Sequence, residues 1–582
     1  MKYVSTLSDK SFLTLFIIIT SLLYFILGIQ GFDMMDEGWC ATAYQQVFNE
    51  PESVQYLFMY YLSLLIGGIW NYLFGWGGIL SFRILAIIVK VLTALFVFKT
   101  LKPYVNRWIV ALGIWLVICC SGYGLFLYHH NHLSALLVTL SAYYMLKALR
   151  TDDGKAMLFS GIILGASLFA RVTNITMTAF VLVLIPYYLE KKDLKSVWHL
   201  FLSYVFGYVI SVATVFVIMF LLGHVNVFWG ALQEGRIAAS DPESSHKLSY
   251  LVLMYAHNYI NVIKHFILLS LLPLVLYVLN RYNDKVNNIV RETILLLILP
   301  FYIYILFTRT TVLFDVYALS TAVTFYYLIK GEKDIRYLSV LCIICLYFLP
   351  LGSDFGIHNM GENCVWLAVP FSLGLLYKSI CLKQSDSIKR EYYKFTFILV
   401  LVFSMMWLNS VLNTCYFDKG SRFEKMYLID NKLATTFTTK RNCEMLNPLL
   451  SELKKYVKKD DELLCFQCIG TIHFLTQTRP YLKNPLVWSY TPLMMKYQLE
   501  KTEIDNKPLP VIVRDKSIFP NWSSYYPDWN NTEAKESFAH KNNRIKYMNE
   551  YLDRHQYSVV WENEVFQLLL PPSKSNSNMS NK

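Results

Sequence analysis

The chain has 582 residues, of which 55% are hydrophobic, 16% are aromatic and only 16% are charged. A mean hydropathy of +0.38 leaves too little polar surface for an ordinary water-soluble globule of this length. The formal net charge of +12 needs no nucleic-acid partner to explain it, because much of it lies in loops between apolar segments.

The first apolar segment, residues 11–30, is too long for the core of a signal peptide, and no small-x-small cleavage site follows it. We therefore interpret it as a retained membrane span. Helices of about 20 residues cross a hydrocarbon core of about 30 Å. Further candidate spans lie at 79–98, 108–127, 131–148, 156–170, 174–189, 198–222, 260–280, 293–308, 312–329, 337–350, 364–380 and 395–412. The sequence predicts a polytopic α-helical membrane protein with about 13 transmembrane helices, in contact with the lipid bilayer.

The Lys and Arg residues predict the orientation, because short basic loops resist translocation. They gather in every second connection: Lys99, Lys102 and Arg107; Lys147, Arg150 and Lys155; Lys191, Lys192 and Lys195; Arg281, Lys285 and Arg291; Lys330, Lys333 and Arg336; Lys383, Lys389 and Arg390. The opposite set carries little beyond Arg171, Arg236, Lys247 and Arg309. We expect a multi-pass protein of the cell inner (plasma) membrane with a cytoplasmic N-terminus.

The connection 31–78 faces outward in this topology and contains an apolar, aromatic stretch, 56–74, interrupted by Gly67-Gly68. If this stretch crossed the membrane, every later loop would change sides and the Lys and Arg pattern would invert. We therefore expect outward interfacial helices at 31–78, within a membrane domain of residues 1–412.

Past residue 412 charges become frequent and apolar runs shorten. We expect a soluble α/β domain at 413–570, outside the cytoplasm, followed by a disordered tail at 571–582 that is rich in Ser, Asn and Lys. Within the domain the pattern predicts helices at 444–457 and 541–555, strands at 462–468 and 509–514, and two short strands in 557–570.

Three carboxylates, Asp33, Asp36 and Glu37, lie just beyond the first span, where charge is conspicuous beside so much apolar sequence. If this segment is helical, Asp33 lies one turn from both of the others. Two close carboxylates raise one another's proton affinity, which suits one as a general base and the other as a hydrogen-bond acceptor or cation ligand. The alternative is a helix N-terminus at which acids favour the dipole.

The chain begins with an apolar first span, followed by the outward pair Asp36-Glu37, an interfacial apolar helix and Arg83 at the outer start of the second span. This layout resembles that of the GT-C glycosyltransferases. The nearest are the bacterial relatives of protein O-mannosyltransferases and of the aminoarabinose transferase that modifies lipid A. The similarity continues through 143–147, through 161–171 and into the exported C-terminal domain.

The resemblance implies transfer of a sugar from a polyprenyl-phosphate or pyrophosphate donor to an extracytoplasmic acceptor such as a glycolipid, polysaccharide or protein, with inversion. It makes Asp36 the candidate base, Glu37 its support and Asp33 a helper. The leaving phosphate needs positive charge rather than a proton. Candidate phosphate-binding residues at outer ends and in outer loops are Arg83, Arg171, Arg309, Arg236, His129 and His132.

Outer arginines also snorkel to lipid headgroups, and histidines also cap helices. No acid accompanies His129 and His132, where some GT-C enzymes place a second acidic motif. We therefore expect no cofactor, with a divalent metal as the alternative. The Gly-rich segment 352–363 supplies a candidate substrate loop with Asp354, His358 and Glu362, for which simple loop turning is the alternative.

Two other functions compete with this one. An O-antigen polymerase or ligase shares the substrates and the many spans, but more usually places its large outer loop between late spans. A lipid-linked sugar flippase or transporter should show paired halves or charges at mid-membrane. We expect the charges of this chain to concentrate at the outer ends of its spans.

Overall fold

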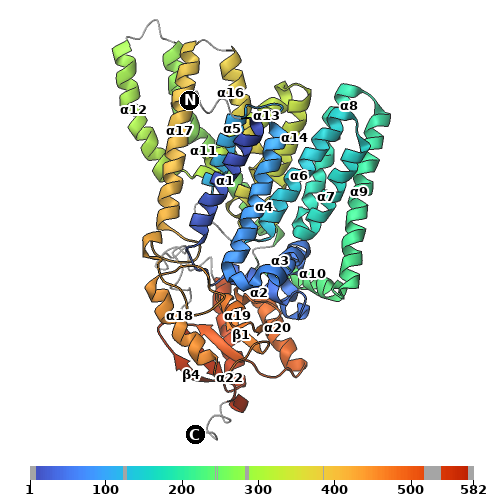
Figure 1. Cartoon of the computed structure of the whole chain (residues 1–582), viewed down its shortest axis with the longest axis vertical. Helices are drawn as coiled ribbons and strands as arrows, with labels where there is room; N and C mark the ends of the chain where they lie inside the picture. Colours follow the sequence, from blue (N-terminus) through green and yellow to red (C-terminus); the bar gives the residue numbers. More distant parts are fainter. Residues whose placement is uncertain are drawn as a thin grey trace.

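A computed structural model describes residues 8–121, 127–242, 244, 247–281, 288–383, 386–516 and 539–574. A bundle of long helices forms one part of the molecule and a smaller domain built on a β-sheet forms the other (Figure 1). The N-terminal helix begins at the end of the bundle far from the sheet.

Each expected span coincides with helical structure. The helices are α1 (Asp9–Gly28), α4 (Gly78–Leu101), α5 (Arg107–Cys119), α6 (His130–Thr151), α7 (Gly154–Ala170), η4 (Val172–Val183) continuing as α8 (Leu184–Lys191), α9 (Leu194–Leu221), α11 (Leu248–Arg281), α12 (Asn288–Arg309), α13 (Val312–Lys330), α14 (Lys333–Phe348), α16 (Ala368–Lys383) and α17 (Asp386–Asn413). Among the described residues, 8 helices are long and apolar enough to cross a bilayer, and three shorter apolar helices accompany them. The multi-span helical fold is confirmed, and the count of 13 stays a prediction.

Short polar turns end one helix and begin the next. Asp152 adopts a left-handed conformation (φ 54°) at the end of α6, and the carboxylate of Asp153 accepts hydrogen bonds from the first N–H groups of α7. Lys192 (φ 51°) and Asp193 repeat this arrangement between α8 and α9. Each turn therefore satisfies one or two of the free N–H groups at the start of the following helix.

Glycines set the close approach of α7 to α9. A Cβ atom on Gly161 would lie 2.1 Å from the carbonyl oxygen of Tyr204, and one on Gly207 would lie 2.2 Å from that of Leu158. Only glycine fits on both sides of this contact, which is the small-residue packing that helices use in membranes.

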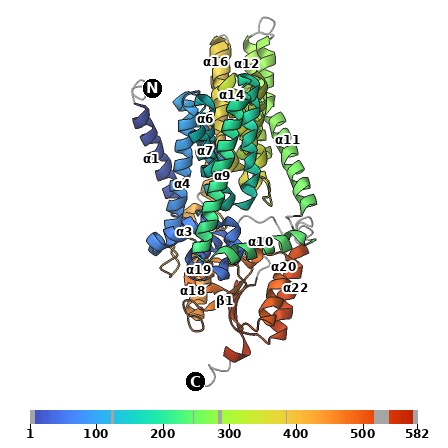
Figure 2. The ribbon, with the colours of Figure 1, turned by 90° about the vertical axis from the view of Figure 1, so that its right-hand side faces the viewer.

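The connection after α1 contains α2 (Asp36–Gln46), η2 (Pro51–Tyr60), α3 (Tyr61–Phe74) and η3 (Gly75–Gly77). Its two ends are bound by one segment: Phe437 N–H donates to Ile29 O (2.9 Å) and Ile79 N–H donates to Leu433 O (3.0 Å). The connection therefore returns to the end of the bundle at which it started, as an interfacial segment does. Figure 1 shows α2 and α3, together with α10 (Val225–Ser240), between the bundle and the sheet, and Figure 2 shows α3 and α10 at the same level.

The C-terminal domain has a five-stranded sheet of order β2-β1-β3-β5-β4. Strand β1 pairs in parallel with β2 and β3, and β5 pairs antiparallel with β3 and β4. The strands are β1 (Glu462–Phe466), β2 (Arg479–Pro480), β3 (Val511–Asp515), β4 (Ser558–Glu562) and β5 (Phe566–Leu570), and the helices are α18 (Lys440–Leu453), α19 (Thr471–Thr476), α20 (Pro492–Ile504) and α22 (Ala539–Arg554). The expected α/β domain is present, with α19, α20 and β2 in addition. Residues 575–582 of the expected tail lie outside the described residues.

The C-terminal domain packs directly against the acidic segment. A Cβ atom on Gly38 of α2 would lie 2.1 Å from Cα of Thr471, so α2 and α19 meet backbone to backbone. On the other side, the carboxylate of Asp241, which follows α10, accepts a hydrogen bond from Leu493 N–H at the start of α20 (2.8 Å). The fold thus places α2 between the bundle and the sheet domain.

Candidate active site

Asp33 is fully buried and is used to build the start of α2. Its carboxylate accepts hydrogen bonds from Met35 N–H and Glu37 N–H, both at 2.7 Å. Burial raises the pKa of Asp33, and the neighbouring carboxyl groups of Asp36 and Glu37 raise it further. Asp33 therefore fixes the geometry of the segment that carries the other two acids.

Glu37 forms a buried, bidentate ion pair with Arg83 of α4. The Nε–Oε1 distance is 2.8 Å and the Nη2–Oε2 distance is 2.7 Å. The remaining guanidinium N–H groups donate to the carbonyl oxygens of Gly28 (2.7 Å), Gln30 (2.9 Å) and Gly31 (2.7 Å). A guanidinium has five N–H donors. The protein itself engages all of them, so the pair ties together α1, α2 and α4.

Asp36 is the one acid of the three whose side chain is partly exposed. The hydroxyl of Tyr416, from the segment after α17, donates a hydrogen bond to its Oδ2 atom. Burial raises the pKa of Asp36 to about 6; the Tyr416 hydrogen bond opposes this shift, and the carboxylate of Glu37 adds to it. Such a carboxyl is ionised at neutral pH and still has appreciable affinity for a proton.

The C-terminal domain forms a wall of this site. Thr471 N–H donates to Met34 O (3.0 Å) and its hydroxyl donates to Asp33 O (2.7 Å). Trp39 donates its indole N–H to Oδ1 of Asn484 (3.0 Å). Together with Tyr416, these contacts hold α2 against the C-terminal domain. That domain is distant in the sequence: 438 residues separate Asp33 from Thr471.

Aromatic rings extend from the acids toward Arg171. Tyr60 stacks on His130 with ring centroids 3.8 Å apart and planes 11° apart. Trp39 presents its ring edge-on to both, at 6.0 Å from Tyr60 and 6.4 Å from His130. Tyr60 in turn lies within electrostatic range of Arg171. The three rings therefore form one aromatic cluster, which includes Trp39 of α2 and whose Tyr60 lies within electrostatic range of Arg171.

Arg171 is a buried cation at the junction of α7 and η4. Its Nη1 donates to the carbonyl oxygen of Leu349 (3.1 Å). Asp354 of the expected substrate loop lies within electrostatic range. Among the described residues, however, no carboxylate forms an ion pair with the Arg171 guanidinium, which distinguishes it from Arg83.

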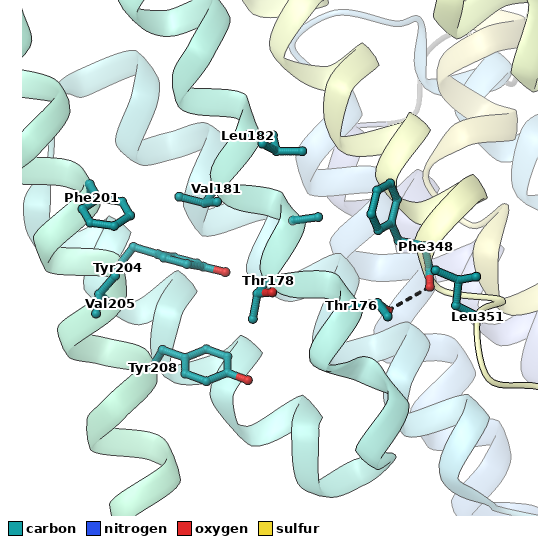
Figure 3. A pocket seen from close by; sticks show the side chains of 11 residues that line it. Thr176, Thr178, Val181, Leu182, Phe201, Tyr204, Val205, Tyr208, Phe348 and Leu351 are labelled. Atoms are coloured by element: carbon teal, nitrogen blue, oxygen red, sulfur yellow. Dashed lines mark hydrogen bonds between the residues drawn. The ribbon is translucent and has the colours of Figure 1, made fainter. Parts of the chain in front are cut away.

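An apolar groove of about 620 Å³, whose lining residues Figure 3 shows, lies near Arg171. Leu349, which accepts the Arg171 hydrogen bond, lies between Phe348 and Leu351 of the groove wall. Figure 3 shows the Thr176 hydroxyl donating to Phe348 O (2.9 Å) at this end. The groove is lined by Thr176, Thr178, Ala179, Val181, Leu182, Phe201, Tyr204, Val205, Tyr208, Phe348 and Leu351. Its exposed apolar side chains on η4 and α9 open it toward lipid.

A further pair of charged side chains, separate from the acids of α2 and from Arg171, lies inside the bundle. Lys90, in the middle of α4, pairs with Glu362 of α15 (Ile357–Cys364) at 2.9 Å and lies 5.1 Å from the centre of the Tyr24 ring. The expectation that charge would concentrate at the outer ends of the spans is wrong for Lys90. This residue was visible in the sequence as a lone lysine in an apolar segment.

His129 caps α6, because its Nδ1 accepts a hydrogen bond from Asn131 N–H (3.3 Å). Burial, aided by the nearby charge of Lys90, lowers the pKa of His129 to about 3. It can therefore offer a ligand a hydrogen bond but no charge. The ring of His132, which is buried on α6, lies 4.1 Å from that of His129.

The remaining predicted residues are more dispersed. Arg309 is exposed at the end of α12, Arg236 on α10 and His358 on α15. In the part of the chain that the structure describes, Arg236 and Arg309 form no ion pair or hydrogen bond with the acids of α2. Nor do the described residues contain a group of three or more His, Cys, Asp or Glu side chains suited to a metal ion.

Comparison with known proteins agrees with the predicted class. Residues 61–220, from α3 to α9, match the family model described as dolichyl-phosphate-mannose-protein mannosyltransferase. This match confirms the resemblance to membrane glycosyltransferases, and with it the prediction of a glycosyltransferase. The matched segment contains Arg83 and Arg171 but begins after Asp36.

The crystal structure of ArnT from Cupriavidus metallidurans in the apo state is similar at a TM-score of 0.47 and 11% sequence identity, over 96% of this chain and 98% of that chain. No curated protein sequence matches the chain.

We expect Glu37→Gln to lower the free energy of unfolding by about 3–5 kcal/mol, because it leaves the buried charge of Arg83 without a counter-ion. Thermal unfolding in detergent measures the loss. Glu50→Gln is the matched control, since Glu50 pairs with Arg479 at an exposed position and should cost less than about 1 kcal/mol. Equal shifts for the two variants would contradict the role assigned to the buried pair.

Proposed function

We propose that this protein transfers a sugar from a polyprenyl-phosphate or polyprenyl-pyrophosphate donor to a hydroxyl of an extracytoplasmic acceptor, such as a glycolipid, polysaccharide or protein. The observation that carries the proposal is the state of Asp36. It is the partly exposed member of a buried acidic cluster, it is oriented by Tyr416, and burial raises its pKa to about 6. A general base works best with a pKa close to the pH at which it operates.

In the proposed reaction Asp36 accepts the proton of the acceptor hydroxyl while the hydroxyl oxygen attacks the anomeric carbon. The bond from that carbon to the phosphate oxygen breaks, and the polyprenyl phosphate or pyrophosphate leaves with the bonding electrons as an anion. A single displacement of this kind inverts the anomeric centre. Glu37 and Asp33 do not touch the reacting atoms in this scheme; they hold α2 in the geometry that presents Asp36.

Arg171 and the groove fit the donor. A buried guanidinium without a carboxylate partner among the described residues is suited to a phosphate, whose charge it would stabilise as the bond breaks. The adjacent groove is apolar and opens toward lipid, as the hydrocarbon chain of the donor requires. Asp354, within range of Arg171, is placed to meet the sugar.

The other predicted phosphate contacts have smaller parts in this proposal. Arg83 is fully engaged by the protein, and His129 and His132 can only assist through hydrogen bonds. Arg309 and Arg236 are exposed, and we assign them to the lipid headgroups. Glu362 neutralises Lys90, and we assign no contact to His358, which is exposed on α15. We propose no metal cofactor, because Arg171 supplies the positive charge.

The Lys and Arg pattern supports a cytoplasmic N-terminus in the inner (plasma) membrane. Because the acidic cluster and the sheet domain lie at the opposite end of the bundle, this orientation places both outside the cytoplasm. The acceptor would then reach Asp36 from the side of the C-terminal domain.

We expect Asp36→Asn to reduce sugar transfer at least about 100-fold, since a carboxamide cannot take the acceptor proton. The assay is transfer from a polyprenyl-phosphate sugar in membranes, with donor binding measured in parallel. Asp430→Asn, at an exposed acid, is the control. Unchanged transfer by Asp36→Asn would refute the base. A different result would favour a flippase: the parent protein transfers no sugar but moves the donor across vesicle membranes, and Asp36→Asn leaves that movement unchanged.

Tyr416→Phe should raise the pKa of Asp36, because the lost hydroxyl stabilises the carboxylate. Transfer requires the ionised base, so activity falls as the pH drops through this pKa. The acidic limb of the pH profile of kcat/KM should have its midpoint near 6 in the parent protein and move to higher pH in the variant. Tyr497→Phe, at an exposed tyrosine of α20, should leave the midpoint unchanged. A fall in activity at all pH values, with no shift of the midpoint, would show that Tyr416 acts only on packing.

Arg171→Gln should raise KM for the lipid donor about 10- to 100-fold, which corresponds to the loss of a charged hydrogen bond worth about 1.5–3 kcal/mol. Arg171→Lys should recover part of the affinity. Lys432→Gln, an exposed site in the C-terminal domain, controls for a general change of surface charge. If KM for the donor stays the same while the protein remains folded, the phosphate binds elsewhere.

A further inference from the structure

Two segments of the chain expose large apolar side chains where the bundle meets the C-terminal domain. The first, residues 72–76, includes Tyr72 (88% exposed) and Trp76 (82% exposed) at the end of α3 and in η3. The second, residues 423–428, includes Phe423 (70% exposed) and Met426 (69% exposed) and belongs to the C-terminal domain. We refer to these two segments together as the collar.

The two segments of the collar are neighbours in space. Residues 433–438 run between them: the Thr435 hydroxyl donates to Gly77 O (2.8 Å), and Tyr427 N–H donates to Thr438 O (3.0 Å). Figure 2 shows α3 at the level where the helical bundle meets the sheet domain. The collar therefore combines an interfacial helix with a loop more than 300 residues away, both bound to residues 433–438; 358 residues separate Gly77 from Thr435.

The collar continues the lipid-facing surface of the spans. The guanidinium of Arg422 donates to Leu27 O of α1 (2.7 Å) and to Val411 O of α17. The Gln30 amide donates to Lys425 O (3.2 Å). The segment that presents Phe423 is thus fixed to the last turns of two membrane helices. Their outer faces carry exposed apolar side chains of their own, such as Ile26 and Leu408.

The lysine of the second segment points inward. Lys425 is fully buried and pairs with Asp418 at 2.9 Å, and Asp418 also accepts hydrogen bonds from Thr438 (2.9 Å) and Asn442 (2.8 Å). With its lysine turned inward, this segment exposes four large apolar side chains, Phe423, Met426, Tyr427 and Leu428, beside one exposed acid, Glu424. Contiguous apolar patches on a soluble domain mark a surface that contacts something apolar.

We propose that the collar inserts into the headgroup layer of the bilayer and anchors the C-terminal domain to the lipid surface. Tyr and Trp concentrate at this depth in membrane proteins because one end of each ring is apolar and the other forms hydrogen bonds. Lipid is the occupant because the collar is continuous with helices that cross the bilayer. The inference is independent of the proposed chemistry: it holds whether or not Asp36 is a base.

Site-specific photo-crosslinking tests the proposal in the full-length protein. p-Benzoylphenylalanine is introduced in place of Phe423 or Trp76, and the protein is reconstituted into vesicles of phosphatidylethanolamine and phosphatidylglycerol. After irradiation, mass spectrometry measures the fraction of protein that carries a lipid adduct. The positive control is Ile26 on α1, an exposed position on a membrane span. The negative control is Ile504 on α20, which is 77% exposed on the C-terminal domain.

The expected result is a lipid adduct at positions 423 and 76 in a yield similar to that at position 26 and about tenfold above that at position 504. Yields at 423 and 76 that match position 504 would overturn the proposal. So would crosslinked dimers in place of lipid adducts, because they would show that a second copy of the chain covers the collar. All four substituted positions are exposed, so each variant keeps the buried contacts of the fold.

Discussion

The buried pair of Arg83 and Glu37 is the interaction on which the acidic site depends. Placing two charges away from water costs several kcal/mol per ion and is tolerated only when every donor and acceptor is satisfied. Here the guanidinium meets both carboxylate oxygens and the carbonyl groups at the end of α1. One side chain from α4 thereby sets the position of α2 against two membrane helices.

Because the Arg83–Glu37 pair fixes α2, the three neighbouring acids Asp33, Asp36 and Glu37 have different roles. Asp33 is used for the N–H groups that open α2, and Glu37 is neutralised by Arg83. Asp36 faces the partly open side and meets a tyrosine from the segment after the last membrane helix. Because carboxyl groups a few ångströms apart resist joint ionisation, such a division leaves one of them free to exchange a proton.

Much of the fold could be predicted because the bilayer constrains it so strongly. Apolar run length predicted the helices of the bundle, and the cost of charge drew attention to Asp33, Asp36 and Glu37. The site could not be completed in the same way, because Tyr416 meets Asp36 across 380 residues of sequence. No local pattern marks that contact. Lys90 is different, since its place within an apolar span was a visible signal of the polar group that it forms with Glu362.

The Arg83–Glu37 ion pair also bears on the pKa of Asp36. Burial pushes the pKa of Asp36 upward, and the nearby carboxylate of Glu37 pushes in the same direction. If Glu37 lacked the compensating charge of Arg83, two like charges would share a buried site and the proton affinity of Asp36 would rise beyond what a base needs near neutral pH. The Tyr416 hydrogen bond pulls the other way. The pKa of this carboxyl, about 6, therefore reflects burial and Glu37 on one side and Tyr416, from the segment after α17, on the other, so the chain beyond the last membrane helix contributes directly to the site.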